Sequence, residues 1–312
     1  MATILITEQI DPSGIELLEQ AGHTVTRMET RDPAELAEKL RDADAMLVRI
    51  LDIPADIIRN APRLKLISKH GVGVDNIDLD AARSAGVAVS ITPGANSLSV
   101  AEHTMTLLMA LSKNLIFTAS QYRDIGFAAK NGPTGQEISG KTLGVIGCGR
   151  IGSRVANMAM HGFGMRVLVY DPYITEAPEG AELVTDRDRI FRESDFVTLH
   201  PVLSPETFHC VGARELGLMK PTAILLNCGR GPLVEEPALI AALEEGRLAG
   251  AGLDVTEKEP CDPDSPLFRM PNVILTPHFA PTTREAAVRV STIAAQNIID
   301  FLEGREFPGR IV

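Results

Sequence analysis

The chain has 312 residues, 45% of them hydrophobic, and a formal net charge of −11 at pH 7. Its length suffices for about two domains with a sizeable core, and its acidic balance argues against nucleic acid as a partner. No apolar run approaches the ~20 residues of a membrane span, and the N-terminus enters a predicted strand without a basic leader, so we expect a cytoplasmic protein without a membrane partner. The four scattered cysteines form no C-x-x-C pair, which predicts reduced thiols and no metal site.

Short β-rich runs alternate with helical patterns along nearly the whole chain, which is typical of parallel α/β sheets. The first set of predicted strands comprises Thr3–Thr7, Thr24–Met28, Ala45–Arg49, Leu64–Lys69 and Val87–Ile91. The second set comprises Leu143–Ile146, Val167–Tyr170, Phe196–His200, Ala223–Asn227, Gly252–Val255 and Val273–Thr276. We therefore expect two sheets of five to six strands, each between layers of helices.

Two long helical patterns flank the second set of strands. Residues 97–114 are apolar almost all round, which predicts a helix buried between domains or subunits. Residues 284–303 follow the last strand, and we expect that helix to return to the first domain.

The glycine-rich segment after the first strand of the second set carries the strongest functional signal. Gly147, Gly149 and Gly152 have the G-x-G-x-x-G spacing before a helical pattern over 150–161. Glycines at these places allow a tight turn, close approach to a pyrophosphate, and close packing of the helix on the strand. Asp171 ends the next strand, 19 residues after the last glycine, where its carboxylate can accept the adenosine ribose hydroxyls. The pattern predicts NAD as cofactor, and Asp171 disfavours NADP by repelling its 2′-phosphate.

Four further segments follow predicted strands, where open α/β sheets place their ligands. The loop around Val72 and Gly73 can expose backbone N–H groups to a carboxylate, although an ordinary turn explains the spacing equally well. Arg230 stands between two glycines after a buried strand. Its guanidinium can bind a substrate carboxylate through two hydrogen bonds and polarise a neighbouring carbonyl. The alternative interpretation is an ordinary arginine in an exposed surface loop.

The last two segments offer an acid and a histidine. Glu257 and Glu259 follow the next strand and cannot be distinguished by position; for both, a solvated acid is the alternative. His278, behind a proline at a strand end, is suited to proton transfer near neutral pH. The rivals that also lie near strand or helix ends are His70, His103 and His200.

Together these residues match the needs of 2-keto acid reduction: an anchor for the carboxylate, an electrophile for the carbonyl and a proton donor. Arg230 can supply the first two, assisted by the amides of Val72 and Gly73, and His278 can supply the third. A carboxylate beside the imidazole favours the imidazolium, and Glu259 is the candidate for that partner. In the oxidation direction, neutral His278 would act as the base.

These motifs, in this order, resemble the D-isomer-specific 2-hydroxyacid dehydrogenase family over nearly the whole chain. The resemblance rests on Gly71–Asn76, Asn96–Ser97, Val100–His103, Gly147–Gly152 with Asp171, Asn227–Gly231, Leu253–Pro260 and Thr276–His278. It implies that Arg230, Glu259 and His278 form the catalytic set. The NAD contacts that we expect from it are Gly147, Gly149, Arg150, Ile151, Gly152, Asp171, Pro201, Cys228, Gly229, Arg230, Asp254 and His278. The expected substrate contacts are Arg49, His70, Val72, Gly73, Arg230 and His278.

The resemblance also implies an α/β architecture of two Rossmann-like, doubly wound parallel-sheet domains separated by a cleft. A substrate-binding domain would comprise residues 1–97 and 285–312, and an NAD-binding domain residues 98–284. A homodimer formed mainly by the NAD-binding domain is expected.

Within the family the chain is similar to the D-3-phosphoglycerate dehydrogenase branch, with three departures. The sequence ends at Val312, so we expect a short form without the regulatory domain. His70 stands where that branch has an arginine that assists the phosphate, although Arg49 matches a basic residue of the branch. The basic, Trp-containing stretch that the branch has after the linker helix is replaced by Gly126-Phe127-Ala128-Ala129-Lys130. Apart from these three, Phe279-Ala280-Pro281 after His278 replaces a more usual Gly-Gly turn. With fewer cations at the site, a phosphorylated substrate is less strongly supported, because each guanidinium paired with a phosphate dianion adds to its binding affinity.

The predicted function is therefore the NAD-dependent interconversion of a small anionic D-2-hydroxy acid and its 2-keto acid. Oxidation of D-3-phosphoglycerate is the runner-up within the same chemistry. The alternative from another class is a non-catalytic, NAD-sensing regulator with the same fold, since fold alone does not determine function. The complete set of Arg230, Glu259 and His278 favours the enzyme.

Overall fold

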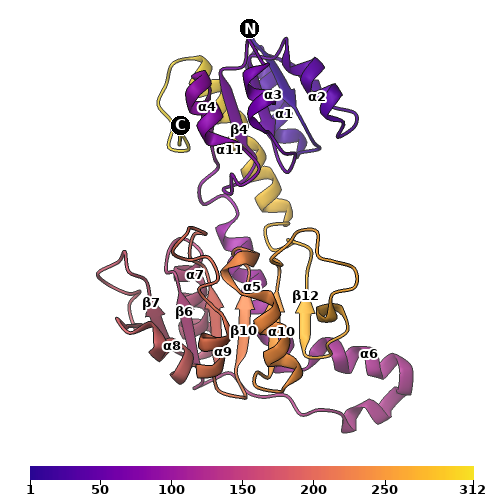
Figure 1. Ribbon diagram of the computed structural model, residues 1–312, viewed down its shortest axis with the longest axis vertical. Coiled ribbons are helices and arrows are strands. Elements are labelled where there is room, and N and C mark those ends of the chain that lie inside the picture. The colour runs from indigo at the N-terminus through magenta and orange to yellow at the C-terminus, as the bar shows by residue number, and fades with distance from the viewer. The chain divides into compact units, whose positions relative to one another are not determined.

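The computed structural model describes all 312 residues and divides into two compact α/β units (Figure 1). Unit 1 comprises Met1–Asn96 and Thr282–Val312, so both ends of the chain build it; unit 2 comprises Ser97–Pro281. Each unit contains one parallel sheet covered by helices, which confirms the predicted fold class.

Unit 1 has a five-stranded sheet in the order β2-β1-β3-β4-β5. Its strands are β1 (Thr3–Ile6), β2 (Thr24–Arg27), β3 (Ala45–Val48), β4 (Leu66–Lys69) and β5 (Ala88–Ser90). Its helices are α1 (Pro12–Gln20), α2 (Pro33–Leu40), α3 (Ala55–Arg59), α4 (Leu79–Ala85) and α11 (Arg284–Leu302). Helices α1 and α11 cover one face, and α2, α3 and α4 cover the other. Because both faces are covered, β3 and β4 are buried along their whole length.

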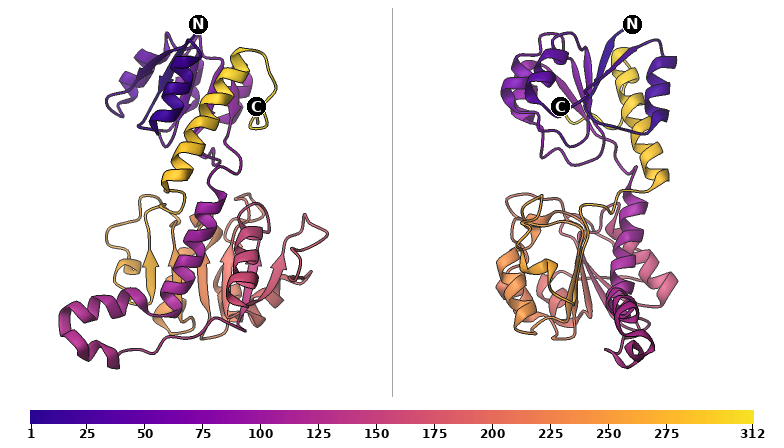
Figure 2. Two further views of the ribbon diagram at one scale, coloured as in Figure 1. Left: turned by 180° about the vertical axis from the view of Figure 1, so that it is seen from behind. Right: turned by 90° about the vertical axis from the view of Figure 1, so that its right-hand side faces the viewer.

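Unit 2 has a seven-stranded sheet in the order β12-β11-β10-β9-β6-β7-β8. Its strands are β6 (Thr142–Ile146), β7 (Arg166–Tyr170), β8 (Glu182–Leu183), β9 (Phe196–Leu199), β10 (Ile224–Asn227), β11 (Gly250–Leu253) and β12 (Val273–Leu275). Its α-helices are α5 (Ser97–Ser112), α6 (Leu115–Ile125), α7 (Gly152–Asn157), α8 (Arg187–Glu193), α9 (Ala213–Leu218) and α10 (Glu236–Glu244). Helices α5 and α7 pack on one face, and α8, α9 and α10 pack on the other (Figure 2).

Three expectations about unit 2 need correction. The sheet has seven strands rather than five to six, because the two-residue edge strand β8 is too short to show a periodic pattern. The helix predicted over 150–161 is α-helical only as α7 and continues as a π-helical turn over Met158–Gly162. The apolar helix α5 is buried within unit 2, against β10, β11, β12 and α7, so no second domain or subunit is needed to explain its composition. None of the helices combines the length and the apolar character needed to cross a bilayer.

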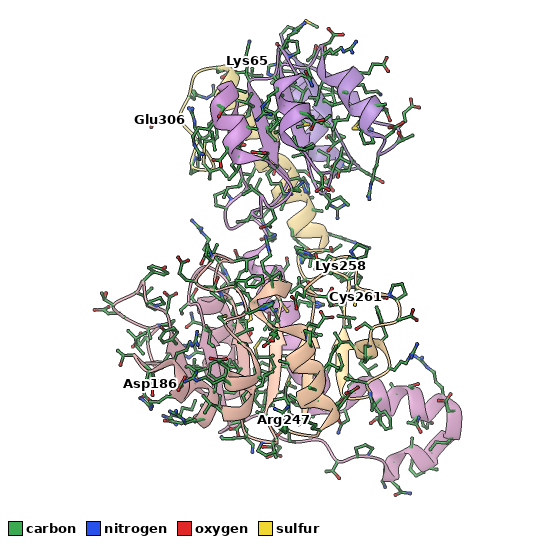
Figure 3. All side chains as sticks on the ribbon, viewed as in Figure 1. Lys65, Asp186, Arg247, Lys258, Cys261 and Glu306 are labelled. Atoms are coloured by element: carbon green, nitrogen blue, oxygen red, sulfur yellow. The ribbon has the colours of Figure 1, made fainter.

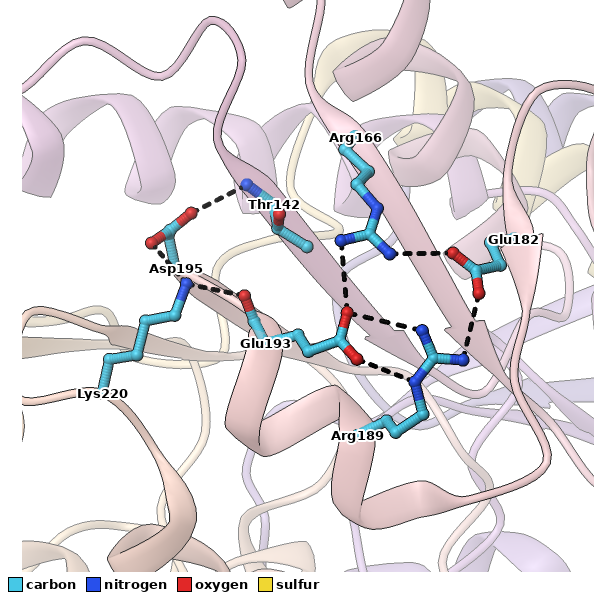
Figure 4. A network of polar contacts seen from close by, with 7 residues as sticks. All are labelled: Thr142, Arg166, Glu182, Arg189, Glu193, Asp195 and Lys220. Atoms are coloured by element: carbon cyan, nitrogen blue, oxygen red, sulfur yellow. Dashed lines mark hydrogen bonds and ion pairs between the residues drawn. The ribbon is translucent and has the colours of Figure 1, made fainter.

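An aspartate ties together two strands at the amino edge of each sheet. Asp44, just before β3, accepts the N–H of Thr3 at 2.9 Å. Asp195, just before β9, likewise accepts the N–H of Thr142 at 2.9 Å, and the Lys220 ammonium donates to its other oxygen at 2.9 Å (Figure 4). Burial alone would raise the pKa of Asp195, but these two donors outweigh it and lower the pKa below its usual value.

A surface ion-pair network lies beside Asp195 at the same edge (Figure 4). It joins two arginines and two glutamates whose side chains are 35–49% exposed: Arg166, Arg189, Glu182 and Glu193. Exposed ion pairs contribute little to stability because water screens them. The partly buried Asp195, which accepts the N–H of Thr142, therefore contributes more to the order of this edge than the network does.

Candidate active site

The predicted site residues of unit 2 lie in the loops at the carboxyl edge of the seven-stranded sheet, except Gly152, which is the first residue of α7. In sheet order, His278 follows β12, Glu259 follows β11, Arg230 follows β10, Pro201 follows β9, Gly147–Gly152 begins the loop after β6, and Asp171 follows β7. Parallel strands present their carboxyl ends at one edge, so these loops meet there. The candidate catalytic residues follow the three neighbouring strands β10, β11 and β12 at one end of the sheet. The glycine loop follows β6, which is separated from β10 by β9.

The imidazole of His278 is paired with the carboxylate of Glu259. The Nδ1–H of His278 donates to Oε2 of Glu259 at 2.9 Å, and the two side chains are 44% and 42% exposed. Figure 3 labels Lys258 and Cys261, which flank Glu259 and the following proline in the loop after β11. Because Nδ1 is engaged, the opposite nitrogen, Nε2, is the one available for proton exchange.

The other glutamate of this loop, Glu257, pairs with a different histidine, His209. Oε1 of Glu257 pairs with Nε2 of His209 at 2.8 Å, and Oε2 accepts the N–H of Glu236 at 3.0 Å. Glu257 is therefore bound to His209 and to the N–H of Glu236 at the start of α10, whereas Glu259 is hydrogen-bonded to His278. His209 was not identified from the sequence, because nothing in its local pattern indicates a partner 48 residues away.

The buried carboxylate of Asp254 holds the turn that carries His278. One oxygen accepts the Thr276 hydroxyl at 2.6 Å and the N–H of Phe279 at 2.7 Å, and the other accepts the N–H of Ala280 at 2.8 Å. The N–H of His278 itself donates to the backbone carbonyl of Asp254 at 2.7 Å. The Asp254 side chain has no exposed surface. Its geometry assigns it to positioning the turn, and the direct NAD contact expected of it stays a prediction.

The backbone of His278 needs this support. Its φ of 52° lies in the left-handed region, which residues other than glycine rarely adopt. Such a conformation costs on the order of 1–3 kcal/mol and persists where surrounding contacts over-determine it. The hydrogen bonds from Thr276, His278 and Phe279 to Asp254 fix the backbone of His278 in this conformation.

An asparagine shapes the loop that presents Arg230. Oδ1 of Asn227 accepts the N–H of Gly229 at 3.0 Å, and its Nδ2 donates to the carbonyl of Arg230 at 2.9 Å. The guanidinium of Arg230 donates to the carbonyl of Gly229 at 2.9 Å, and the residue is partly buried. The positioning role of Asn227 was not identified, although an asparagine at a strand end before glycine is a recognised turn signal.

The glycine loop has the geometry expected of a pyrophosphate cradle. Gly147 has a φ of 83°, and a Cβ there would lie 2.5 Å from the backbone N of Pro201. A Cβ at Gly152 would lie 2.1 Å from the carbonyl oxygen of Gly147, so the helix packs directly on the strand end. A Cβ at Gly149 would meet nothing within 4 Å, so the loop is open at that point. Asp171 stabilises the loop by accepting the N–H of Cys148 at 2.8 Å.

The remaining predicted NAD contacts differ in accessibility. Arg150 is exposed, Ile151 and Pro201 are partly buried, and Cys228 is buried. Burial raises the pKa of the Cys228 thiol to about 12, so this side chain stays a thiol and offers no anionic group to the edge.

Two rival histidines of unit 2 have structural positions. Burial lowers the pKa of His200 to about 4, and its Nε2 is paired with the Thr198 hydroxyl at 2.9 Å, so it is not placed to exchange protons with a substrate. Nε2 of His103 lies 3.1 Å from the hydroxyl of Thr276. Since that hydroxyl donates to Asp254, His103 is the donor and supports the His278 turn.

The expected substrate residues of unit 1 lie at the carboxyl edge of its own sheet. Arg49 follows β3 and is exposed; His70 follows β4, and Nε2 of His70 lies 2.9 Å from the hydroxyl of Ser291 in α11. Burial, followed by the charge of Arg49, lowers the pKa of His70 to about 4. His70 is therefore neutral near pH 7. Its expected contact with the substrate stays a prediction, and in that contact the neutral imidazole would act by hydrogen bonding rather than by charge. Val72, 43% exposed, and Gly73 stand in the adjoining loop.

Comparison with known proteins agrees with this geometry. Residues 105–280 match the family model described as D-isomer specific 2-hydroxyacid dehydrogenase, NAD binding domain. The chain is 44% identical to D-3-phosphoglycerate dehydrogenase of Methanocaldococcus jannaschii over 310 residues, 97% of this chain but only 58% of that protein. It is 38% identical to glyoxylate reductase of Thermococcus litoralis over 324 residues, 99% of this chain and 96% of that protein. The crystal structure of the TT0316 protein from Thermus thermophilus superposes with a TM-score of 0.92 at 36% identity, covering 99% of this chain and 100% of that one. The chain belongs to the D-isomer specific 2-hydroxyacid dehydrogenase family.

Proposed function

We propose that the protein is an NAD-dependent oxidoreductase that interconverts a small D-2-hydroxy acid and its 2-keto acid. The observation that carries this proposal is the His278–Glu259 pair at 2.9 Å, on the same sheet edge as Arg230 and the glycine loop. The pair supplies a proton donor with a defined tautomer, and the glycine loop supplies a place for a dinucleotide.

In the proposed mechanism each residue has one task. The guanidinium of Arg230 binds the substrate carboxylate and polarises the adjacent carbonyl. NAD, when bound in its reduced form, supplies the hydride that the carbonyl carbon receives. Protonated His278 gives its Nε2 proton to the carbonyl oxygen, which completes the hydroxy acid, and Glu259, paired with Nδ1, orients the ring for this transfer. In the reverse direction neutral His278 takes the hydroxyl proton.

NAD is the proposed cofactor rather than NADP. The residues present fit a dinucleotide: the loop is open at Gly149, and the partly exposed carboxylate of Asp171 retains lone pairs beyond those that accept Cys148 and Tyr173. The same carboxylate would face the 2′-phosphate of NADP with like charge.

The proposed substrate carries no phosphate. The relatives' names include both a phosphoglycerate dehydrogenase and glyoxylate reductases. With His70 neutral, Arg49 is the one cation among the four residues expected to contact substrate from unit 1. A single guanidinium is sufficient to bind a small keto acid, whereas tight binding of a phosphate dianion requires several paired guanidinium groups.

A substrate and cofactor panel tests these proposals together. NADH oxidation with glyoxylate or hydroxypyruvate is expected to exceed that with phosphohydroxypyruvate by about 10-fold in kcat/KM, the equivalent of one missing charged hydrogen bond. Replacing NADH by NADPH is expected to lower kcat/KM by at least about 10-fold. A preference for phosphohydroxypyruvate would move the assignment to phosphoglycerate oxidation. Silence across the panel, with NAD binding intact, would refute dehydrogenase activity.

We further propose that the protein forms a homodimer through unit 2. Helix α6 has no buried residue, and Figures 1 and 2 show it extending away from the seven-stranded sheet. The large apolar side chains of α6 and the following turn that are 54–75% exposed are Leu115, Ile116, Tyr122, Ile125 and Phe127. Exposed apolar surface of this kind marks interaction sites. Light scattering of the purified protein is expected to give twice the 33.6 kDa chain mass, and Ile116→Asp is expected to shift it toward the monomer. A monomeric wild type would contradict the proposal.

A further inference from the structure

The loop after β3, which carries Arg49, is held by side chains from two other strand ends of unit 1. In the order β2-β1-β3-β4-β5 the chain leaves β1 toward one edge and returns to β3 on the other side of β1. Connections diverge at such a switch point, and a crevice opens there at the carboxyl edge, where ligands of open α/β sheets bind. Glu8, the second residue after β1, lies at this point, and its side chain contacts the loop after β3.

The carboxylate of Glu8 occupies this crevice as an anion that belongs to the protein itself. Oε2 accepts the N–H of Arg49 at 2.9 Å, and Oε1 accepts the N–H groups of Ile50 and Leu51, each at 2.7 Å. Three successive amides turned toward one carboxylate form the kind of backbone concavity that binds anions. Burial alone would raise the pKa of Glu8, but the Thr7 hydroxyl and these amides outweigh it and lower the pKa. Glu8 is therefore ionised at neutral pH.

The carbonyl groups of the same loop are held from the other side. Nζ of the buried Lys69 donates to the carbonyl of Arg49 and to Oδ1 of Asn76, both at 2.5 Å. Nδ2 of Asn76 donates to the carbonyl of Leu51 at 2.6 Å. Asn76 closes the Gly71–Asn76 loop, so Lys69 and Asn76 join that loop to the Arg49 loop.

Polar contacts are what order this segment. Arg49 is exposed and the Ile50 side chain is 54% exposed, so burial of these side chains does not fix the backbone there. Both loops that we expect to contact the substrate from unit 1 meet at these contacts. A small displacement of the Arg49 backbone would move a guanidinium at the end of a long side chain, and misplacement of about 1 Å can cost on the order of 10²-fold in activity.

We propose that Glu8, Lys69 and Asn76 are positioning residues that fix the Arg49 loop against the Gly71–Asn76 loop and so set the affinity for substrate. This inference rests on the proposed function. It adds three residues that bind neither substrate nor cofactor themselves and act through Arg49 and the Gly71–Asn76 loop.

The test is Glu8→Gln, which keeps the shape of the side chain but puts an amide donor against one of the loop N–H groups. KM for the keto acid is expected to rise about 10-fold or more with little change in kcat, since binding is lost without loss of chemistry. Affinity for NAD is expected to stay at the wild-type value. In an Arg49→Ala background the same change is expected to raise KM by much less than in the wild type, because Glu8 acts mainly through Arg49.

Glu35→Gln is the matched control. The Glu35 carboxylate also accepts two neighbouring N–H groups, those of Glu29 at 2.8 Å and Thr30 at 2.9 Å, in the same unit but away from the Arg49 loop. This variant is expected to leave KM unchanged. Equal effects of Glu8→Gln and Glu35→Gln on KM, or fully additive effects of Glu8→Gln and Arg49→Ala, would overturn the inference.

A second measurement does not depend on turnover and separates the two proposals. By hydrogen exchange, the amides of Arg49, Ile50 and Leu51 are expected to exchange faster in Glu8→Gln, with β1 and β3 still protected. Unchanged exchange at these three amides would refute the positioning role even in an active enzyme. A wild type that reduces no keto acid would refute the proposed function, and with it the link from these contacts to substrate affinity.

Discussion

Replacing His278 by alanine is expected to lower kcat by about 10²- to 10⁴-fold, the usual contribution of a positioned general acid or base. The affinity for NAD is expected to remain, because the glycine loop and Asp171 follow other strands of the sheet. Steady-state kinetics with the best substrate of the panel, together with NADH binding followed by fluorescence, measures both quantities. A non-catalytic NAD-sensing protein would instead show no turnover to lose.

His209→Ala is the control for this variant. His209 also has a left-handed backbone, with φ of 49°, and its ring also pairs with a carboxylate, that of Glu257 at 2.8 Å. The two variants remove the same kind of pair, so a general effect of deleting one would appear in both. We expect His209→Ala to retain nearly all activity. If it loses turnover and His278→Ala does not, the catalytic pair has been assigned to the wrong histidine.

Replacing Asp254 by asparagine is expected to lower kcat by about 10²-fold, because the turn that presents His278 loses its anchor and small misplacements cost that much. Asparagine keeps one acceptor oxygen but turns an amide N–H toward a backbone donor, either Phe279 or Ala280. A buried donor without an acceptor also costs about 1–3 kcal/mol, so thermal unfolding is expected at a lower temperature. Activity and the unfolding temperature should be measured on the same preparation.

Asp195→Asn separates the two effects. Asp195 also has a carboxylate that is largely shielded from solvent (16% exposed) and accepts a backbone N–H, that of Thr142 at 2.9 Å, but it lies at the opposite edge of the same sheet. We expect a similar loss of thermal stability with kcat unchanged. A parallel loss of kcat in both variants would mean that Asp254 acts through the stability of unit 2 and not through the position of His278.

Much of the fold could be predicted because its signals are local. Strand and helix patterns depend on neighbouring residues, and eleven of the twelve strands were placed, the exception being β8 with two residues. The glycine loop was equally accessible, since turn geometry and close packing at Gly147 and Gly152 depend on residues near in sequence or on a strand that the pattern itself predicts.

The electrostatic state of the site depends on tertiary structure. From the sequence, His70 is expected to titrate near neutral pH. In the folded chain, burial and the neighbouring charge of Arg49 lower its pKa, so the imidazole is neutral. Glu257 and Glu259 are equivalent by position, and only the arrangement of loops gives one to His209 and the other to His278. A pKa and a hydrogen-bond partner depend on which distant segments surround a group, and no local pattern contains that information.

The order of the elements, the dinucleotide fingerprint and the three residue types needed for keto acid reduction can all be read from the amino-acid sequence. How these residues are held follows from the folded chain: Glu8 reaches amides 41 to 43 residues away, and Asp254 anchors a turn more than 20 residues further along the chain. Glycine spacing and hydrophobic period act through covalent neighbours, so a linear pattern records them. The order of strands in a sheet instead brings remote loop ends together at one edge, where they determine each other's geometry and charge.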